Sequence, residues 1–232
     1  MPFLFFFIFL QTLLPDGAPY YQETNPNFWI MEPWNALSSL TFWIPVFYWY
    51  ARVKPHFKHY WILTFSLPLL FLGGLGSALF HAFRVSRIFL ALDVLPILLL
   101  TLLVSIYFWQ KLLGSWLGTI ALMIGFMLLS ALIINIPAQY LSNKINILYL
   151  LRGITLFLPM VIFLFRTQFL AAPALLISIV WFIAALMFRQ IDKDVHLHQM
   201  EIGSHWLWHI STAVGAFYLG KYLFVINEKK DA

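Results

Sequence analysis

The sequence predicts an all-α fold, a polytopic membrane protein built as a bundle of seven transmembrane helices. Composition is the first reason, because 62% of the 232 residues are hydrophobic, only 10% are charged, and the mean hydropathy is +0.85. Soluble domains typically contain about 25% charged residues. The second reason is that apolar stretches of about 20 residues, long enough to cross a bilayer, recur between short polar breaks. Most of the chain is therefore expected to lie in lipid.

Seven apolar stretches have the length of a membrane span. The expected spans, in chain order, are residues 33–51, 60–82, 88–109, 115–136, 146–165, 171–188 and 203–225. Each of the first six ends where charged and turn-forming residues gather, at residues 52–55, 84–87, 110–111, 142–144, 166–168 and 189–201. No Ser/Gly-rich or charged linker marks a second domain, so residues 21–232 are expected to form one seven-helix domain.

Residues 1–20 are expected to be a separate hydrophobic segment at the N-terminus. Its apolar stretch, residues 3–14, is short for a span and is interrupted by Gln11. Two interpretations stay open: the stretch is the hydrophobic core of a signal peptide, or it is an uncleaved segment that dips into the lipid.

The basic residues predict how the bundle is oriented. If the N-terminus faces outward, eight of the 14 Lys and Arg residues fall on the inner side, five fall on the outer side, and Arg152 lies within a span. The positive-inside rule therefore favours an outer N-terminus and a cytoplasmic C-terminus. The formal charge of +5 comes from basic residues scattered among the loops rather than from a patch. Nucleic acid is therefore excluded as an expected partner.

Four polar residues fall near the outer ends of three expected spans. His81 ends the second span, and Asp93 lies just inside the start of the third. His205 and His209 open the seventh. At a rise of 1.5 Å per residue, Asp93 and His209 each lie about 8 Å inside their helix starts. A common depth on one side of the membrane predicts a shared site.

Helical spacing brings these residues together in pairs. Ser77 and His81 are four residues apart, as are His205 and His209, so each pair projects from one face of its helix. An imidazole in an apolar span is costly without a partner. Three imidazoles can hold one zinc ion and leave a coordination position open for water. In this interpretation Asp93 is the base or orienter of that water, and Ser77 donates a hydrogen bond to the developing oxyanion.

Each of these residues also has a simpler interpretation. Asp93 can neutralise Arg152, because buried charges in a membrane are normally paired, and the Ser77 hydroxyl can bond the backbone of its own helix. Haem ligation is disfavoured, because His205 and His209 lie one turn apart on one helix and cannot approach a haem from opposite faces. The chain has no cysteine, so a metal must be held by histidines and carboxylates. The common depth of the polar groups favours the metal site.

A second group of oxygen ligands precedes the first span. Glu23 and Glu32, with Asn25 and Asn35, bring two carboxylates and two amides to the outer side. Oxygen ligands on a short loop suit calcium better than zinc. The other interpretation is a solvated loop in which Asn25 or Asn27 serves a turn.

Three sequence blocks resemble one known family. They are residues 32–38 (Glu-Pro-Trp-Asn-Ala-Leu-Ser), residues 76–81 (Gly-Ser-Ala-Leu-Phe-His) with residues 92–97 (Leu-Asp-Val-Leu-Pro-Ile), and residues 203–209 (Gly-Ser-His-Trp-Leu-Trp-His). Their order and spacing, between about residues 21 and 222, are similar to those of the alkaline ceramidase family. That family belongs to a group of seven-helix membrane hydrolases that also includes the adiponectin receptors.

The resemblance implies a zinc amidase that cleaves the N-acyl bond of ceramide, a membrane lipid, to give a sphingoid base and a fatty acid. It implies zinc ligation by His81, His205 and His209. Ser77 and Asp93 would then be the catalytic residues. The short loops and the Glu-Pro-Trp-Asn form look like the bacterial branch of the family, which extends the expected substrates to other N-acyl lipids.

The resemblance also implies a calcium site before the first helix. Its ligands would be Glu23, Asn25 and Glu32, with the backbone carbonyl of Tyr21. The chain departs from the family at this point. The family has an Asp before the first Glu of the site, whereas residues 20–22 of this chain read Tyr-Tyr-Gln.

Two functions of other classes stay open. One is a non-enzymatic lipid receptor or sensor of the same fold, in which zinc is structural. The other is a transporter or channel, although the polar groups gather near one face and transporters usually keep their sites near the midplane.

Overall fold

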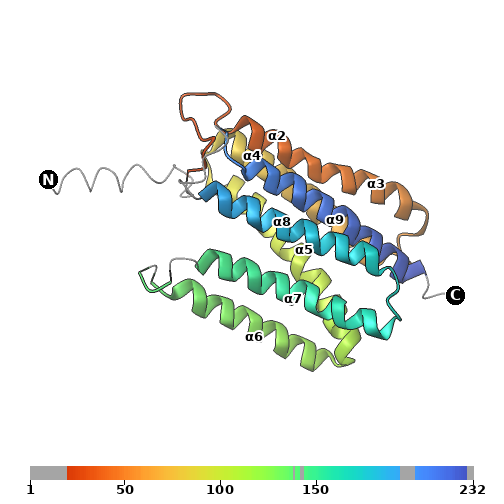
Figure 1. Ribbon diagram of the computed structural model, residues 1–232. Helices are drawn as coiled ribbons and strands as arrows, with labels where there is room; N and C mark the ends of the chain where they lie inside the picture. The colour runs from red at the N-terminus through yellow and green to blue at the C-terminus, as the bar shows by residue number, and fades with distance from the viewer. Residues whose placement is uncertain (1–19, 138, 142–143, 194–201, 229–232) are drawn as a thin grey trace.

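The computed structural model describes residues 20–137, 139–141, 144–193 and 202–228. Within these ranges the chain is helical and contains no strand, and the helices lie side by side in one bundle (Figure 1). The prediction of an all-α fold is confirmed. The predicted N-terminal segment, residues 1–20, lies outside the described residues except for Tyr20.

Six helices in the described part of the chain are long and apolar enough to cross a membrane. They are α4 (Trp61–Phe83), α5 (Arg87–Leu113), α6 (Trp116–Asn135), α7 (Lys144–Arg166), α8 (Ala172–Lys193) and α9 (His205–Glu228). These helices correspond to the second through seventh predicted spans, with ends shifted by a few residues. The chain is therefore a multi-pass membrane protein.

The first predicted span, residues 33–51, is helical but interrupted. It consists of α2 (Pro33–Ser39), the 3₁₀ helix η1 (Leu40–Phe42) and α3 (Trp43–Val53), followed by a second 3₁₀ helix, η2 (Lys54–His56). Pro45 explains the interruption, because proline lacks an N–H and its ring clashes with the carbonyl of the residue four positions earlier, Thr41, which lies in η1. Figure 1 shows α2 and α3 in line along the bundle. The predicted count of seven spans is not confirmed, because no single helix here has the required length.

Helices α4 and α5 approach each other closely at Gly76. A Cβ atom at this position would lie 2.3 Å from the backbone carbonyl of Leu92 and 2.6 Å from the backbone nitrogen of Asp93. Contacts that short are sterically forbidden, so only glycine permits this approach. The approach brings Ser77, the next residue on α4, toward Asp93 on α5.

Helices α4 and α9 lie at the centre of the bundle. Half of each span, 50%, is buried inside the protein, compared with 11% for α6, which lies at the edge of the bundle (Figure 1). At one end of the bundle α2 packs against both α4 and α9. At the other end these helices enclose an aromatic and aliphatic core that includes Val53, Phe108 and Tyr222.

Candidate metal centre

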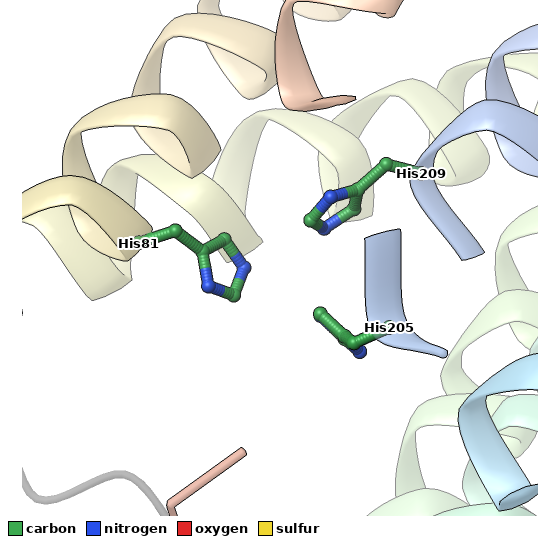
Figure 2. A group of neighbouring side chains, drawn as sticks. All are labelled: His81, His205 and His209. Carbon is green, nitrogen blue, oxygen red and sulfur yellow. The ribbon is translucent and has the colours of Figure 1, made fainter. Parts of the chain in front are cut away.

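Three histidines from the two central helices meet at one end of the bundle. His81 lies in the last turn of α4, and His205 and His209 lie in the first turns of α9. All three side chains are buried, and their candidate ligand atoms lie within 4.8 Å of one another. Figure 2 shows the three rings directed toward one another. This group can hold a metal ion.

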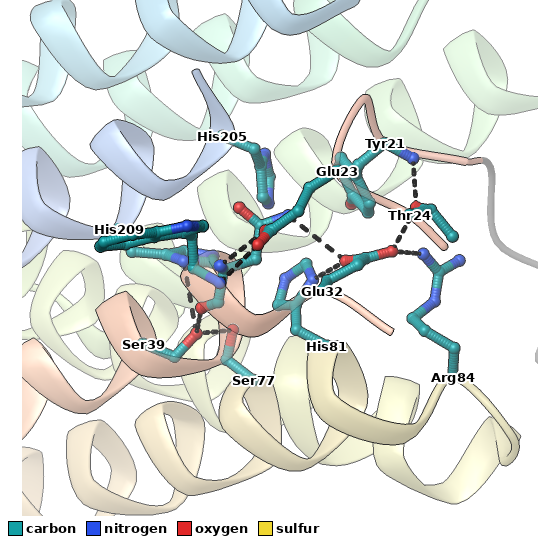
Figure 3. Close-up of polar contacts among 12 residues, drawn as sticks. Tyr21, Glu23, Thr24, Glu32, Ser39, Ser77, His81, Arg84, His205 and His209 are labelled. Carbon is teal, nitrogen blue, oxygen red and sulfur yellow. Dashed lines mark hydrogen bonds and ion pairs between the residues drawn. The ribbon is translucent and has the colours of Figure 1, made fainter. Parts of the chain in front are cut away.

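Two of the three imidazoles have polar partners at Nδ1 (Figure 3). The carboxylate of Glu32 accepts a hydrogen bond from Nδ1 of His81. The Nδ1 atom of His209 lies 2.9 Å from the hydroxyl of Ser38 and 3.3 Å from that of Ser39. A hydrogen-bond partner at Nδ1 fixes the orientation of the ring and leaves Nε2 for a metal.

The third histidine, His205, is positioned through its backbone. Asp192 on α8 accepts hydrogen bonds from the backbone N–H groups of Ser204, at 2.8 Å, and His205, at 3.0 Å. These bonds cap the start of α9. Gly203 makes room for the cap, because its φ is +70° and a Cβ atom there would lie 2.3 Å from Oδ1 of Asp192.

The ring of His205 supplies the observation that favours a metal. Its Nδ1 atom is buried and has no hydrogen-bond partner among the described residues. Buried polar atoms in native proteins are nearly always paired, and an orphaned one often marks an absent water or ion. A donor set of imidazoles suits zinc, copper, iron or nickel. The residues present therefore fit a transition metal.

Tyr21 lies against the histidines on the side of the N-terminal loop. Its ring centroid is 4.1 Å from that of His205 and 5.2 Å from that of His81. Burial raises the pKa of the Tyr21 phenol far above its ordinary value, and the nearby carboxylates of Asp93 and Glu32 raise it further. The phenol is therefore neutral at physiological pH.

Ser77 and Asp93 lie beside the histidines. Ser77 is buried, its oxygen is 3.0 Å from the hydroxyl of Ser39, and its side chain is hydrogen-bonded to Asp93. Arg152, the alternative partner considered for Asp93, has its guanidinium carbon 5.5 Å from the ring centroid of Tyr149, and the main charges acting on Asp93 are those of His81 and Arg84. Asp93 is thus associated with the histidine group rather than with the arginine of α7.

The three residues predicted as calcium ligands have protein partners. Glu23 accepts hydrogen bonds from the backbone N–H groups of Trp34, at 2.5 Å, and Asn35, at 2.9 Å, and so caps α2. Asn25 accepts one from the backbone of Asn27, which is the turn role considered for it. The calcium prediction itself stays a prediction, but these contacts do not resemble an open oxygen cage.

Glu32 has the most contacts of the three. It accepts hydrogen bonds from the Thr24 hydroxyl, at 2.5 Å, from His81 and from the guanidinium of Arg84. Burial alone would raise the pKa of Glu32, but the hydrogen bond and charge of His81 and the charge of Arg84 outweigh it and hold the pKa below its ordinary value. For Glu23, by contrast, burial dominates and raises the pKa.

Several residues that support the site were not predicted from the sequence. Ser39 and Asp192 looked like ordinary polar residues, and Arg84 was counted among the basic residues of an outer loop. The structure places Arg84 at the end of α4 and fully buries it. Arg84 lies three residues after His81, and nothing in the neighbouring sequence distinguishes it from a solvated arginine at a helix end.

No protein-family model and no curated protein sequence matches this chain. The structure itself therefore defines the class of protein. It is an all-α, multi-pass membrane protein with a buried histidine triad that can hold a metal ion.

Proposed function

We propose that this chain is an intramembrane zinc hydrolase that cleaves the N-acyl bond of ceramide or a related N-acyl lipid. The products are a free fatty acid and an amine lipid. The observation that carries the proposal is the buried triad of His81, His205 and His209, with Ser77 and Asp93 beside it. A metal site built only to stabilise the fold needs no such polar pair at its edge.

Zinc is the proposed metal because three imidazole ligands with no thiolate form a common catalytic zinc site. Zinc at such a site polarises a carbonyl and lowers the pKa of a bound water to about 7. The burial of the triad supports this, since the ion would act in a medium of low dielectric constant, where charge stabilisation is strong.

Asp93 is proposed to transfer the protons of the reaction, and Ser77 to stabilise the negative charge that develops on the carbonyl oxygen. Water adds to the amide carbon, and Asp93 takes the proton that this water loses. The Ser77 hydroxyl donates a hydrogen bond to the carbonyl oxygen as negative charge develops on it. Asp93 then delivers its proton to the nitrogen when the C–N bond breaks, so the amine leaves in its neutral form.

The lipid is proposed to reach the site sideways from the bilayer. Asp93 lies on α5 between residues whose side chains are exposed on the outside of the bundle, among them Leu92, Val94 and Leu95. Apolar side chains at this position would face acyl chains in a membrane. A lipid amide can thus approach Asp93 without leaving the membrane.

The proposed topology has seven spans, with the N-terminus and the site on the outer side and the C-terminus in the cytoplasm. Residues 33–53 measure about 31 Å at 1.5 Å per residue, which matches the hydrocarbon thickness of a bilayer. The alignment of α2 with α3 supports counting them together as one interrupted span (Figure 1).

The test is metal analysis of the purified protein combined with a panel of N-acyl lipids, followed by mass spectrometry of released fatty acid. We expect stoichiometric zinc and release from at least one lipid. Asp93→Asn is expected to keep the zinc and abolish release. Protein without stoichiometric zinc would refute the proposal, and zinc without release from any lipid would favour a receptor.

Two buried serines of α4, Ser66 and Ser77, provide a test of the proposed oxyanion donor in the same assay. Ser77→Ala removes the proposed oxyanion donor, whereas Ser66→Ala removes a buried hydroxyl of the same helix that bonds the carbonyl of Ile62 at 2.7 Å. We expect about 10²-fold slower release for Ser77→Ala and an unchanged rate for Ser66→Ala. Equal rates for the two variants would exclude the role given to Ser77.

A further inference from the structure

A buried positive charge lies directly behind the histidine triad. The side chains of Arg84 and Glu32 are both 0% exposed, and Nη1 of Arg84 donates a hydrogen bond to Oε1 of Glu32. The other oxygen of Glu32 accepts from Nδ1 of His81 (Figure 3). One carboxylate therefore connects a permanent cation to a candidate metal ligand.

The fold fixes the place of this cation. Arg84 ends α4 in the left-handed conformation, with φ of 52°, and its backbone N–H bonds the carbonyl of Phe80 at 2.9 Å. The guanidinium carbon lies 4.6 Å from the ring centroid of Phe80 and 5.5 Å from that of Tyr21. Aromatic faces stabilise a desolvated cation. A buried charge is tolerated only when it is compensated in this way.

The same cation holds the N-terminal loop. Glu32 also accepts the hydroxyl of Thr24, and the backbone N–H of Met31 bonds the carbonyl of Ala82, two residues before Arg84, at 2.9 Å. The loop is thus bound to the end of α4 by a side-chain contact, between Glu32 and Arg84, and by a backbone hydrogen bond, between Met31 and Ala82. A bound metal ion could hold such a loop to the bundle through its carboxylates. Here the positive charge that binds the Glu32 carboxylate is the guanidinium of Arg84.

The oxygen atoms near Arg84 do not fit calcium. Calcium takes six to eight oxygen ligands. The carboxylate of Glu32 is bound by Arg84, His81 and Thr24, and that of Glu23 is bound by backbone N–H groups of α2. A divalent cation added next to a guanidinium on the same carboxylate would be repelled by it.

We propose that Arg84 is the structural cation of the N-terminal loop, in place of the calcium that the family resemblance implies, and that through Glu32 it positions His81 for the metal. Arg84 is a positioning residue in this scheme, since it acts through another side chain. Only the second half of the inference rests on the proposed function, because it presumes that His81 binds zinc.

Calcium addition to the unmodified protein tests the first half. The protein is loaded with zinc, freed of calcium by passing all buffers over chelating resin, and then titrated with CaCl₂, with MgCl₂ as the ionic control. A ligand that binds the folded state raises the Tm. We expect the same Tm with both salts and no calorimetric binding of calcium. A Tm raised by CaCl₂ alone would overturn the inference, whatever the hydrolase assay gives.

Zinc affinity tests the second half, by competition with a chromophoric chelator. Outer partners of a ligating histidine typically contribute 10- to 100-fold in metal affinity. We expect a loss in that range for Arg84→Met and recovery of most of it for Arg84→Lys, which keeps the charge. Arg87→Met removes an exposed charge three residues away and should leave the affinity unchanged.

Phe108→Ala is the control for a general loss of stability, which could by itself weaken zinc binding. Phe108 is buried at the opposite end of the bundle, so its truncation should lower the Tm and leave zinc affinity unchanged. If Arg84→Met binds zinc like the unmodified protein, or if Phe108→Ala weakens zinc as much as Arg84→Met does, the positioning role is wrong. If no variant and no unmodified protein binds zinc, the proposed function fails while the calcium result stands separately.

Discussion

The two ends of the central helices α4 and α9 differ in what they bury. Near the loop of residues 20–32, these helices bury His81, Arg84, His205 and His209. At the other end they bury a core of aromatic and aliphatic side chains, in which the ring of Tyr222 stacks on that of Phe108 with centroids 5.8 Å apart. The polar end depends on specific partners, whereas the apolar end depends on filled volume.

The difference indicates how one helix can contribute both to a candidate metal site and to a stabilising core. Burying polar groups is costly unless each one is paired, and at the polar end the partners come from α2, α8 and the N-terminal loop. At the apolar end the buried side chains are aromatic and aliphatic, and protein interiors of this kind are stabilised by close packing. Changes at the two ends should therefore have separable effects on metal binding and on the free energy of unfolding.

His205→Ala should have the largest effect on function. It removes a ligand of the proposed metal, so we expect zinc content to fall to background and lipid hydrolysis to fall on the order of 10³-fold, about 4 kcal/mol of barrier. His56→Ala is the control, because His56 is exposed in η2 and distant in sequence from the triad. Metal analysis and fatty-acid release measure both variants, and retention of zinc by His205→Ala would contradict the assignment.

Phe108→Ala should have the largest effect on stability. Truncating a buried phenylalanine leaves a cavity and typically costs about 3 kcal/mol or more. We expect a free energy of unfolding lowered by about that amount, measured by denaturant titration in detergent micelles, with zinc stoichiometry preserved. Loss of zinc from this variant would show that the two ends are not independent.

Gly76→Ala should separate activity from metal binding within the polar end. The added methyl group would lie 2.3 Å from the Leu92 carbonyl and so push α5 away from α4. A displacement of about 1 Å can cost roughly 10²-fold in rate, and we expect that loss with zinc retained, because Asp93 moves and the histidines do not. Gly125→Ala on α6 is the matched control, since a Cβ atom there meets nothing within 4 Å. Equal rates for the two variants would contradict the role of this contact.

Asp192→Asn should have a smaller effect at the same end. Both hydrogen bonds go to Oδ1 of Asp192, and the oxygen of the neutral amide can still accept both, but the favourable negative charge at the start of α9 is lost. We expect zinc affinity to fall about tenfold, in the lower part of the range for outer partners of metal ligands. Asn135→Ala, at the exposed end of α6, is the comparison in the same competition assay. No change in affinity would mean that the cap does not position His205.

The long helices α4 to α9 and the grouping of the three histidines could be predicted from the sequence alone. Spans of this length follow from hydropathy alone, and the four-residue spacing of His205 and His209 places both on one helix face. The first helix was predicted as continuous because hydropathy does not register the local effect of Pro45. Its interruption is a matter of backbone geometry rather than of composition.

The supporting contacts could not be predicted in the same way. Glu32 and Arg84 are 52 positions apart, and Ser38 and His209 are 171 apart, so only the packing of the helices brings them together. An arginine at a helix end is also usually solvated, and nothing local distinguishes Arg84 from Arg87. Long-range partners of this kind depend on the tertiary structure rather than on periodicity.

The position of the Tyr21 ring against His81 and His205 has a kinetic consequence. If the proposed zinc ion enters from the aqueous phase on the side of the N-terminal loop, it would pass this ring, whereas an acyl lipid would approach from α5. The ion and the substrate would then use different routes, and the exchange rate of the metal would follow the opening of the N-terminal loop. We therefore expect isotopic zinc exchange to be slow and to accelerate in Tyr21→Ala, without a matching change in the rate at which lipid is bound.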